Sequence, residues 1–175
     1  NWNLDIQKII DSIKPNTRLI SINFPHNPTG KIISMDTFYD LISLARKKNI
    51  YIFNDEIYRL MERDVSKRLV QVSDIYEKGV SLNAMSKSYG MPGLRIGWVA
   101  TKDHDLLDKM EKMKHYLSIC NSAPSEILAI IALNSRKKIL DRTYKIITKN
   151  LKILNKFFLE YEHLFDWKEP DGGCI

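Results

Sequence analysis

A strand, a helix and a second strand are predicted to follow one another between residues 17 and 54. Residues 17–24 and 50–54 are apolar runs of strand length, and the segment between them repeats apolar residues at helical spacing. One face of that helix, expected over residues 34–48, carries Met35, Phe38, Leu41, Ile42 and Ala45. Ser34 is a suitable cap for its N-terminus. Two strands joined by a helix pair in parallel through a right-handed crossover, so this feature predicts an α/β fold with a parallel sheet.

Further elements continue the pattern. Residues 79–85 and 95–100 are predicted strands, and residues 3–13 and 103–118 are predicted helices. A helical pattern then covers residues 125–161, a length that favours two or three helices or one long helix. The chain is long enough to bury one core, or one domain and part of another.

Composition excludes several classes of protein. Apolar residues make up 44% and charged residues 27%, which is typical of a globular domain. The net charge of +6 is spread along predicted helices without a dense block, so we expect no nucleic-acid partner. No apolar run approaches the roughly 20 residues of a membrane helix, so we expect no membrane partner. Cys120 and Cys174 lack a metal-binding spacing, which predicts neither a zinc site nor a disulfide and indicates a reducing, cytoplasmic compartment.

Three polar motifs stand at the carboxyl ends of predicted strands. They are residues 22–30 (INFPHNPTG), 50–58 (IYIFNDEIY) and 83–98 (NAMSKSYGMPGLRIGW). In the third, Lys87 follows an apolar strand and Arg95 comes eight residues later. A lysine amine placed in this way can hold an aldehyde cofactor covalently while an arginine binds that cofactor's phosphate. The alternative for the third motif alone is a solvated loop lysine.

Together these residues resemble the class I/II aminotransferases, fold type I enzymes that depend on pyridoxal 5'-phosphate (PLP). The resemblance covers nearly the whole chain, and residues 86–98 are most similar to the branch that contains histidinol-phosphate aminotransferases. It implies a three-layer α/β/α large domain with a mostly parallel sheet over residues 1–145. Residues 146–175 would be a linker helix and the start of a small α+β domain. We expect the chain to be the middle portion of such an enzyme.

The resemblance assigns catalytic or cofactor-binding roles to six residues. Asp55 would keep the pyridine nitrogen protonated, and Asn27 and Tyr58 would hold the ring's 3'-oxygen. Lys87 would form the Schiff base and then move a proton between the substrate and the cofactor. Outside this context, Asp55 would be a helix cap or surface residue and Asn27 part of an ordinary turn.

Ser86 and Arg95 would hold the phosphate. One departure is Ala84, where the family commonly has Ser or Thr for that purpose. The family's glycine-rich phosphate loop and ring-stacking aromatic residue should precede Asn1, and its carboxylate-binding arginine should follow Ile175. The grip on the phosphate would therefore depend more heavily on Ser86, Arg95 and that upstream loop.

The implied activity is transfer of an amino group from an amino acid to a 2-oxo acid by a ping-pong mechanism, in a homodimer. Two alternatives stay open. A PLP-dependent lyase, decarboxylase or cyclase could use the same residues, and the chain could be an inactive truncated fragment that acts at most as a binding module. The sequence does not identify the amino acid or the 2-oxo acid.

Overall fold

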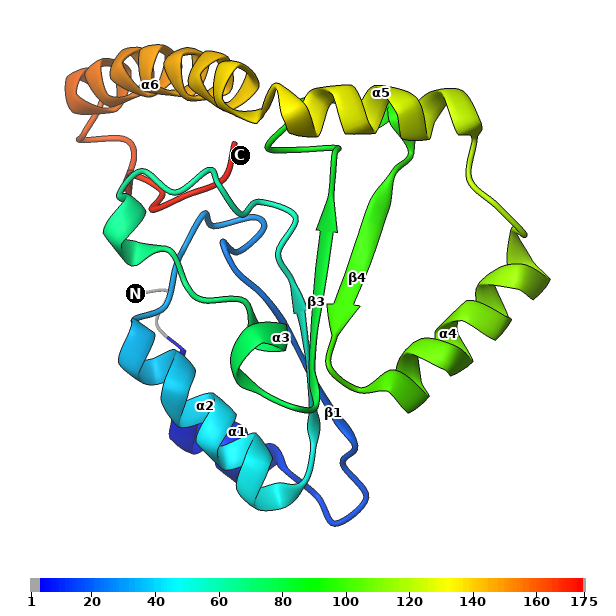
Figure 1. The fold of residues 1–175 in the computed structure, drawn as a ribbon. Helices are drawn as coiled ribbons and strands as arrows, with labels where there is room; N and C mark the ends of the chain where they lie inside the picture. Colours follow the sequence, from blue (N-terminus) through cyan, green and yellow to red (C-terminus); the bar gives the residue numbers. More distant parts are fainter. Residues whose placement is uncertain (1–3, 175) are drawn as a thin grey trace.

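The computed structural model describes residues 4–174, which are built around a four-stranded sheet of order β1-β2-β3-β4 (Figure 1). The strands are β1 (Leu19–Asn23), β2 (Tyr51–Asp55), β3 (Gly79–Ala84) and β4 (Gly97–Thr101). The first three are parallel, and β4 is antiparallel to β3. The expected α/β fold with a mostly parallel sheet is confirmed.

The helices lie on both sides of this sheet. They are α1 (Ile6–Ser12), α2 (Met35–Lys48), α3 (Val72–Ile75), α4 (His104–Leu117), α5 (Ala123–Asn134) and α6 (Arg136–Glu160), with short 3-10 helices at η1 (Val65–Lys67) and η2 (Pro92–Leu94). In Figure 1, α1, α2 and α3 lie to one side of the sheet and α4 to the other. Helices α5 and α6 run end to end near the carboxyl end of β3. The carboxyl edge of the parallel strands therefore faces these two helices.

Helix α2 forms as its sequence predicts. The Ser34 hydroxyl accepts a hydrogen bond from the Thr37 amide at 3.1 Å, and Asn49 ends the helix with a left-handed φ of 58°. The buried face of the helix consists of Phe38, Leu41, Ile42 and Ala45. These side chains share a core with Ile52 of β2 and Val72 of α3. Burying each large apolar side chain contributes about 1.5–3 kcal/mol, so this core joins α2 and α3 to the sheet.

Three sequence-based boundaries need correction. Arg95 does not begin a strand: it follows η2 with a left-handed φ of 56°, and β4 starts at Gly97. The helical pattern over residues 125–161 is two helices, which meet at Ser135, and the first begins at Ala123. Helix α1 begins at Ile6 with Asp5 as its cap, and Asn3 of the predicted helix lies outside the described residues.

No helix within residues 4–174 combines the length and the apolar character that crossing a membrane requires.

Candidate active site

Residues from all three polar motifs meet at the carboxyl edge of the sheet. Asp55 is the last residue of β2, whereas Asn27 and Lys87 lie in the loops that follow β1 and β3. The Asn27 amide nitrogen lies 3.4 Å from the Tyr58 hydroxyl, and the Lys87 amine lies 5.5 Å from the centre of the Tyr58 ring. The amide of Asn27 and the amine of Lys87 therefore both lie near the phenol of Tyr58, at the edge where the parallel strands end.

Asn23, which the sequence analysis did not select, connects two of these motifs. Its side-chain nitrogen donates to the Asp55 carbonyl at 2.7 Å, and its side-chain oxygen accepts from the Asn27 backbone amide at 2.7 Å. Asn23 pairs directly with Asp55 in the β1–β2 register. Asn23 is the last residue of an apolar strand and lies within the first polar motif, and this position is the signal that could have identified it.

The turn after β2 places the carboxylate and the phenol. The Asp55 Oδ1 atom accepts a hydrogen bond from the Ile57 amide at 3.1 Å, which fixes the carboxylate at the start of the turn. Tyr58 follows and is only 2% exposed. Asp55 itself is half-buried, so its carboxylate stands at the border between the sheet and the open edge.

Beneath this turn lies Glu56, a second residue that the sequence analysis missed. Its Oε1 atom accepts hydrogen bonds from the Ser81 hydroxyl at 2.7 Å and the Asn54 amide at 3.2 Å. Its Oε2 atom pairs with Arg59 at 3.3 Å. Burial raises the pKa of Glu56, although Ser81, Arg59, the Val72 amide and Asn54 act in the opposite direction. The network ties the turn that carries Asp55 and Tyr58 to β3.

The loop that carries Lys87 is closed by its own backbone. The Met91 amide donates to the Met85 carbonyl at 3.0 Å, and the Gly90 amide donates to the Lys87 carbonyl at 2.9 Å. Tyr89 is buried in a cluster with Met85 and two alanines of α5, Ala129 and Ala132. Anchoring on both sides holds the half-buried Lys87 near Tyr58.

The two predicted phosphate ligands, Ser86 and Arg95, make fewer contacts with the other site residues. Ser86 is half-buried beside Lys87, whereas Arg95 is exposed and its Nη1 atom donates to the Pro92 carbonyl at 3.0 Å. Within residues 4–174, the hydrogen bonds and ion pairs do not join either residue to Lys87. The phosphate-binding roles of Ser86 and Arg95 stay predictions.

The chain is similar to known proteins. The sequence profile of the family "Aminotransferase class I and II" matches residues 1–168. The chain belongs to the class I and II aminotransferase family. A probable aspartate aminotransferase from Methanocaldococcus jannaschii is 29% identical over 99% of this chain and 46% of its own length. A capreomycidine synthase from Streptomyces vinaceus is 25% identical over 97% of this chain and 43% of its own length.

A solved structure extends the likeness to three dimensions. A PLP-dependent aminotransferase from Streptococcus suis is 33% identical and superposes with a TM-score of 0.84, covering 91% of this chain and 41% of that protein. The chain thus spans less than half the length of these relatives. The division at residues 145 and 146, and the expected similarity to histidinol-phosphate aminotransferases, stay predictions.

Proposed function

We propose that the full-length protein is a PLP-dependent aminotransferase that moves an amino group from an amino acid to a 2-oxo acid. The observation that carries this proposal is the grouping of Asn27, Tyr58 and Lys87 at the carboxyl edge of the sheet. In α/β folds this edge is where ligands bind, and the chain belongs to an aminotransferase family.

The donor set fits the ring of this cofactor. Pyridoxal phosphate supplies an aldehyde that a lysine amine binds covalently and a pyridine ring that withdraws electrons from a bound amino acid. Asp55 offers a carboxylate to a protonated ring nitrogen, and the Ile57 amide holds that carboxylate in place. Asn27 and Tyr58 offer neutral donors to the ring oxygen. Ser86 offers a hydroxyl and Arg95 a planar pair of donors to the phosphate.

Lys87 has two roles in this proposal. Its Nζ atom would hold the aldehyde carbon of the cofactor in the resting protein. The free amine would also accept the proton of a bound amino acid's α-carbon and later return a proton. The anchored loop and the nearby Tyr58 ring keep this amine within reach of one place in both roles.

The test is to trap the covalent bond in the full-length protein. We expect borohydride reduction with PLP, followed by peptide mass analysis, to place the pyridoxyl group on Lys87. Lys78 and Lys102 are matched controls, because they lie at the opposite edge of the sheet and bind Asn49 and the Asp74 carbonyl at 2.6 Å and 2.5 Å. Lys87→Arg should abolish the label and Lys78→Arg should keep it. A label on Lys78 or Lys102 contradicts the assignment.

A second candidate function is a PLP-dependent lyase, decarboxylase or cyclase. The similarity to a capreomycidine synthase is the observation that supports this second candidate. Product analysis with a panel of amino acids and 2-oxoglutarate separates the two. Transamination yields the matching 2-oxo acid together with glutamate, whereas the alternative reactions leave 2-oxoglutarate unconsumed.

We also propose that the full-length protein is a homodimer and lies in the cytoplasm, and sedimentation velocity would test its oligomeric state. The remaining alternative is an inactive truncated product. The coding sequence that flanks this chain distinguishes it from a working enzyme.

A further inference from the structure

Residues 169–174, here called the C-terminal segment, lie against both loops that carry the ring-oxygen donors. In Figure 1 this segment (red) runs back below α6 toward the strands. The Gly172 amide donates to the Gly30 carbonyl at 2.8 Å, in the loop of Asn27. The Gly173 amide donates to the Met61 carbonyl at 3.2 Å, in the turn after Tyr58. The segment therefore connects two loops that are distant in sequence.

The fit between these backbones is close. A Cβ atom added to Gly30 would lie 2.3 Å from the Cβ atom of Pro170 and 2.7 Å from the Gly172 carbonyl oxygen. Gly30 also has a left-handed φ of 64°. Arg63 adds two contacts, since its backbone amide donates to the Asp171 carbonyl at 2.9 Å and its Nη2 atom donates to the Gly173 carbonyl at 2.7 Å. Only a glycine at position 30 permits this approach.

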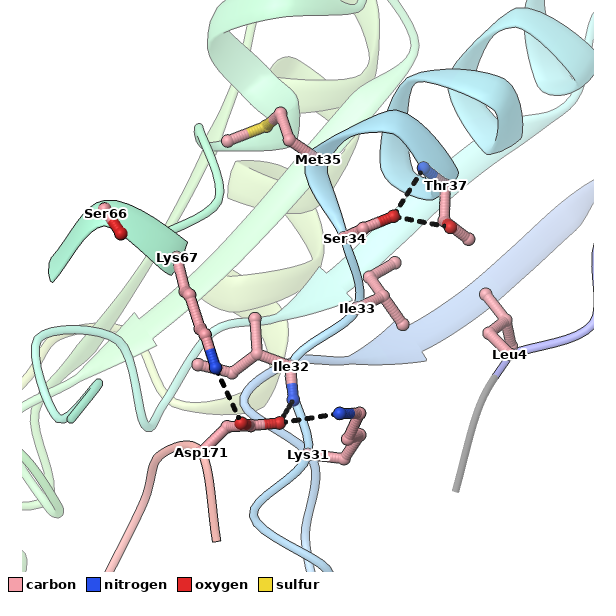
Figure 2. Close-up of a pocket in the computed structure, with 10 residues that line it drawn as sticks. All are labelled: Leu4, Lys31, Ile32, Ile33, Ser34, Met35, Thr37, Ser66, Lys67 and Asp171. Carbon is pink, nitrogen blue, oxygen red and sulfur yellow. Dashed lines mark hydrogen bonds and ion pairs between the residues drawn. The ribbon is translucent and has the colours of Figure 1, made fainter. Parts of the chain in front are cut away.

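The Asp171 carboxylate lies at the centre of the contact (Figure 2). One oxygen pairs with Lys31 at 2.9 Å and accepts from the Ile32 amide at 3.3 Å, and the other pairs with Lys67 at 3.1 Å. The Asp171 side chain is 18% exposed, whereas those of Lys31 and Lys67 are 35% and 54% exposed. One carboxylate thus joins the end of the Asn27 loop to the segment that follows the Tyr58 turn.

The neighbours of Asp171 stabilise its negative charge. Burial alone would raise the pKa of this carboxyl, but hydrogen bonds from Lys31, the Ile32 amide and Lys67 outweigh burial and lower the pKa below its usual value. Both ion pairs are therefore formed at neutral pH.

We propose that Asp171 is a positioning residue, which holds the loop of Asn27 and the turn of Tyr58 together so that their donors converge on one ligand atom. The inference rests on the proposed function. Asn27 is exposed, and its side chain contacts Tyr58 at 3.4 Å, the long end of a hydrogen bond. Asn23 holds the backbone of Asn27 at one end of the loop, and the Asp171 carboxylate holds the loop four residues later, at Lys31. A donor displaced by about 1 Å can lower a rate about 100-fold.

Asp171→Asn in the full-length protein is the principal test. Asparagine can still accept from the Ile32 amide, but it loses both ion pairs. We expect the affinity for PLP to fall about threefold to tenfold, as two partly exposed ion pairs allow. We expect kcat to fall more than KM changes, because the displaced donors contact the cofactor and not the substrate. Asp171→Glu keeps the charge and should recover most of the loss.

Two further variants complete the experiment. Asp64→Asn is a matched control, because Asp64 is exposed and its Oδ1 atom caps η1 through the Ser66 amide at 2.9 Å, a bond that asparagine can also make. It should leave PLP affinity and kcat within twofold of the parent. Lys67→Met removes one ion pair from an exposed position and should give a smaller loss in the same direction. If Asp171→Asn does not fold, Lys67→Met alone tests the positioning role.

The outcomes are distinct. If the parent protein takes no pyridoxyl label on Lys87, the proposed function fails before Asp171 is tested. If the parent is labelled and active while Asp171→Asn and Lys67→Met match it in PLP affinity and kcat, the positioning role is overturned. An equal loss in Asp171→Asn and Asp171→Glu also overturns it, because the charge would then be irrelevant.

Discussion

At the scale of single residues, Glu56 is a buried carboxylate next to the site. The side chain is 2% exposed, and its carboxylate joins β2, β3 and the turn of Asp55. Burial raises its pKa more than its hydrogen bonds and Arg59 lower it. The pKa of Glu56 therefore differs between the folded and the unfolded state. Such a difference makes the free energy of unfolding depend on pH.

Glu56→Gln should change how stability depends on pH. Because the folded pKa is raised, the folded state holds more protons than the unfolded state at a pH between the two values. The contribution of Glu56 to stability is thus complete below its unfolded pKa of about 4.3 and is lost as pH rises through the folded value. Glutamine removes this dependence, so the stability of the variant relative to the parent should increase as the pH rises above about 4.3. Urea unfolding at several pH values measures the difference, and a difference that is constant with pH contradicts the prediction.

Asp55→Asn should remove the charge that we propose faces the ring nitrogen and keep the shape. The asparagine oxygen can still accept from the Ile57 amide, so the turn should stay in place. We expect amino-acid turnover to fall by at least ~100-fold, the low end of what a positioned catalytic group contributes. Single-turnover kinetics measure the effect, with Asp40→Asn on the exposed face of α2 as the control. Unchanged rates would show that another group protonates the ring.

At the scale of elements, local signals determined what could be predicted. The sequence predicts helix α2 almost to the residue, because the Ser34 cap and the apolar spacing are local signals. Strand ends shifted by one or two residues, since pairing with neighbouring strands decides them. Arg95 was placed in a strand because its left-handed backbone, which follows a 3-10 turn, leaves no mark in the apolar pattern. The short helix α3 was missed because it has only one turn and packs through tertiary contacts.

The junction between α3 and β3 yields a test of packing. A Cβ atom at Gly79, the first residue of β3, would lie 2.3 Å from the Val72 carbonyl oxygen, which belongs to backbone and cannot move freely. Gly79→Ala should therefore destabilise the fold by about 1–3 kcal/mol. At Gly93 the same atom would project into open space, so Gly93→Ala should stay within about 0.5 kcal/mol of the parent. Equal free energies of unfolding for the two variants would refute this packing.

At the scale of the whole molecule, topology explains which parts of the site were foreseeable. The sequence places the three polar motifs at the carboxyl ends of strands, which parallel pairing brings to one edge, and the resemblance to aminotransferases selects Asn27, Asp55, Tyr58 and Lys87 within them. The docking of the C-terminal segment was not foreseeable, because Asp171 reaches Lys31 across 140 residues without a local signal. No hydrogen bond or ion pair within residues 4–174 joins Ser86 or Arg95 to Lys87, so the phosphate-binding roles of these two residues are still predictions.

Helices α5 and α6 carry large apolar side chains on their exposed surface. Helix α5 exposes Ile127, Leu128, Ile130 and Ile131 by at least half of their area. Helix α6 adds Ile153 and Leu159 at 60% and 70%. Exposed apolar side chains gathered on neighbouring helices are typical of surfaces that another part of the protein covers. The relatives are more than twice as long as this chain, in agreement with such a cover.

The isolated 175-residue chain should therefore bind PLP weakly and show no transamination. It keeps the amine of Lys87, the carboxylate of Asp55 and the guanidinium of Arg95, but it corresponds to only 46% of an aminotransferase relative. A chain of less than half the length of such a relative would lack part of the contacts that orient the cofactor and the amino acid, and a misplacement of about 1 Å can already lower a rate about 100-fold. The measurement is visible absorption after addition of PLP, together with an assay of a panel of amino acids with 2-oxoglutarate. Sustained turnover at enzyme-like rates, in a chain whose mass excludes any additional residues, would show that the essential parts of the site all lie within these residues.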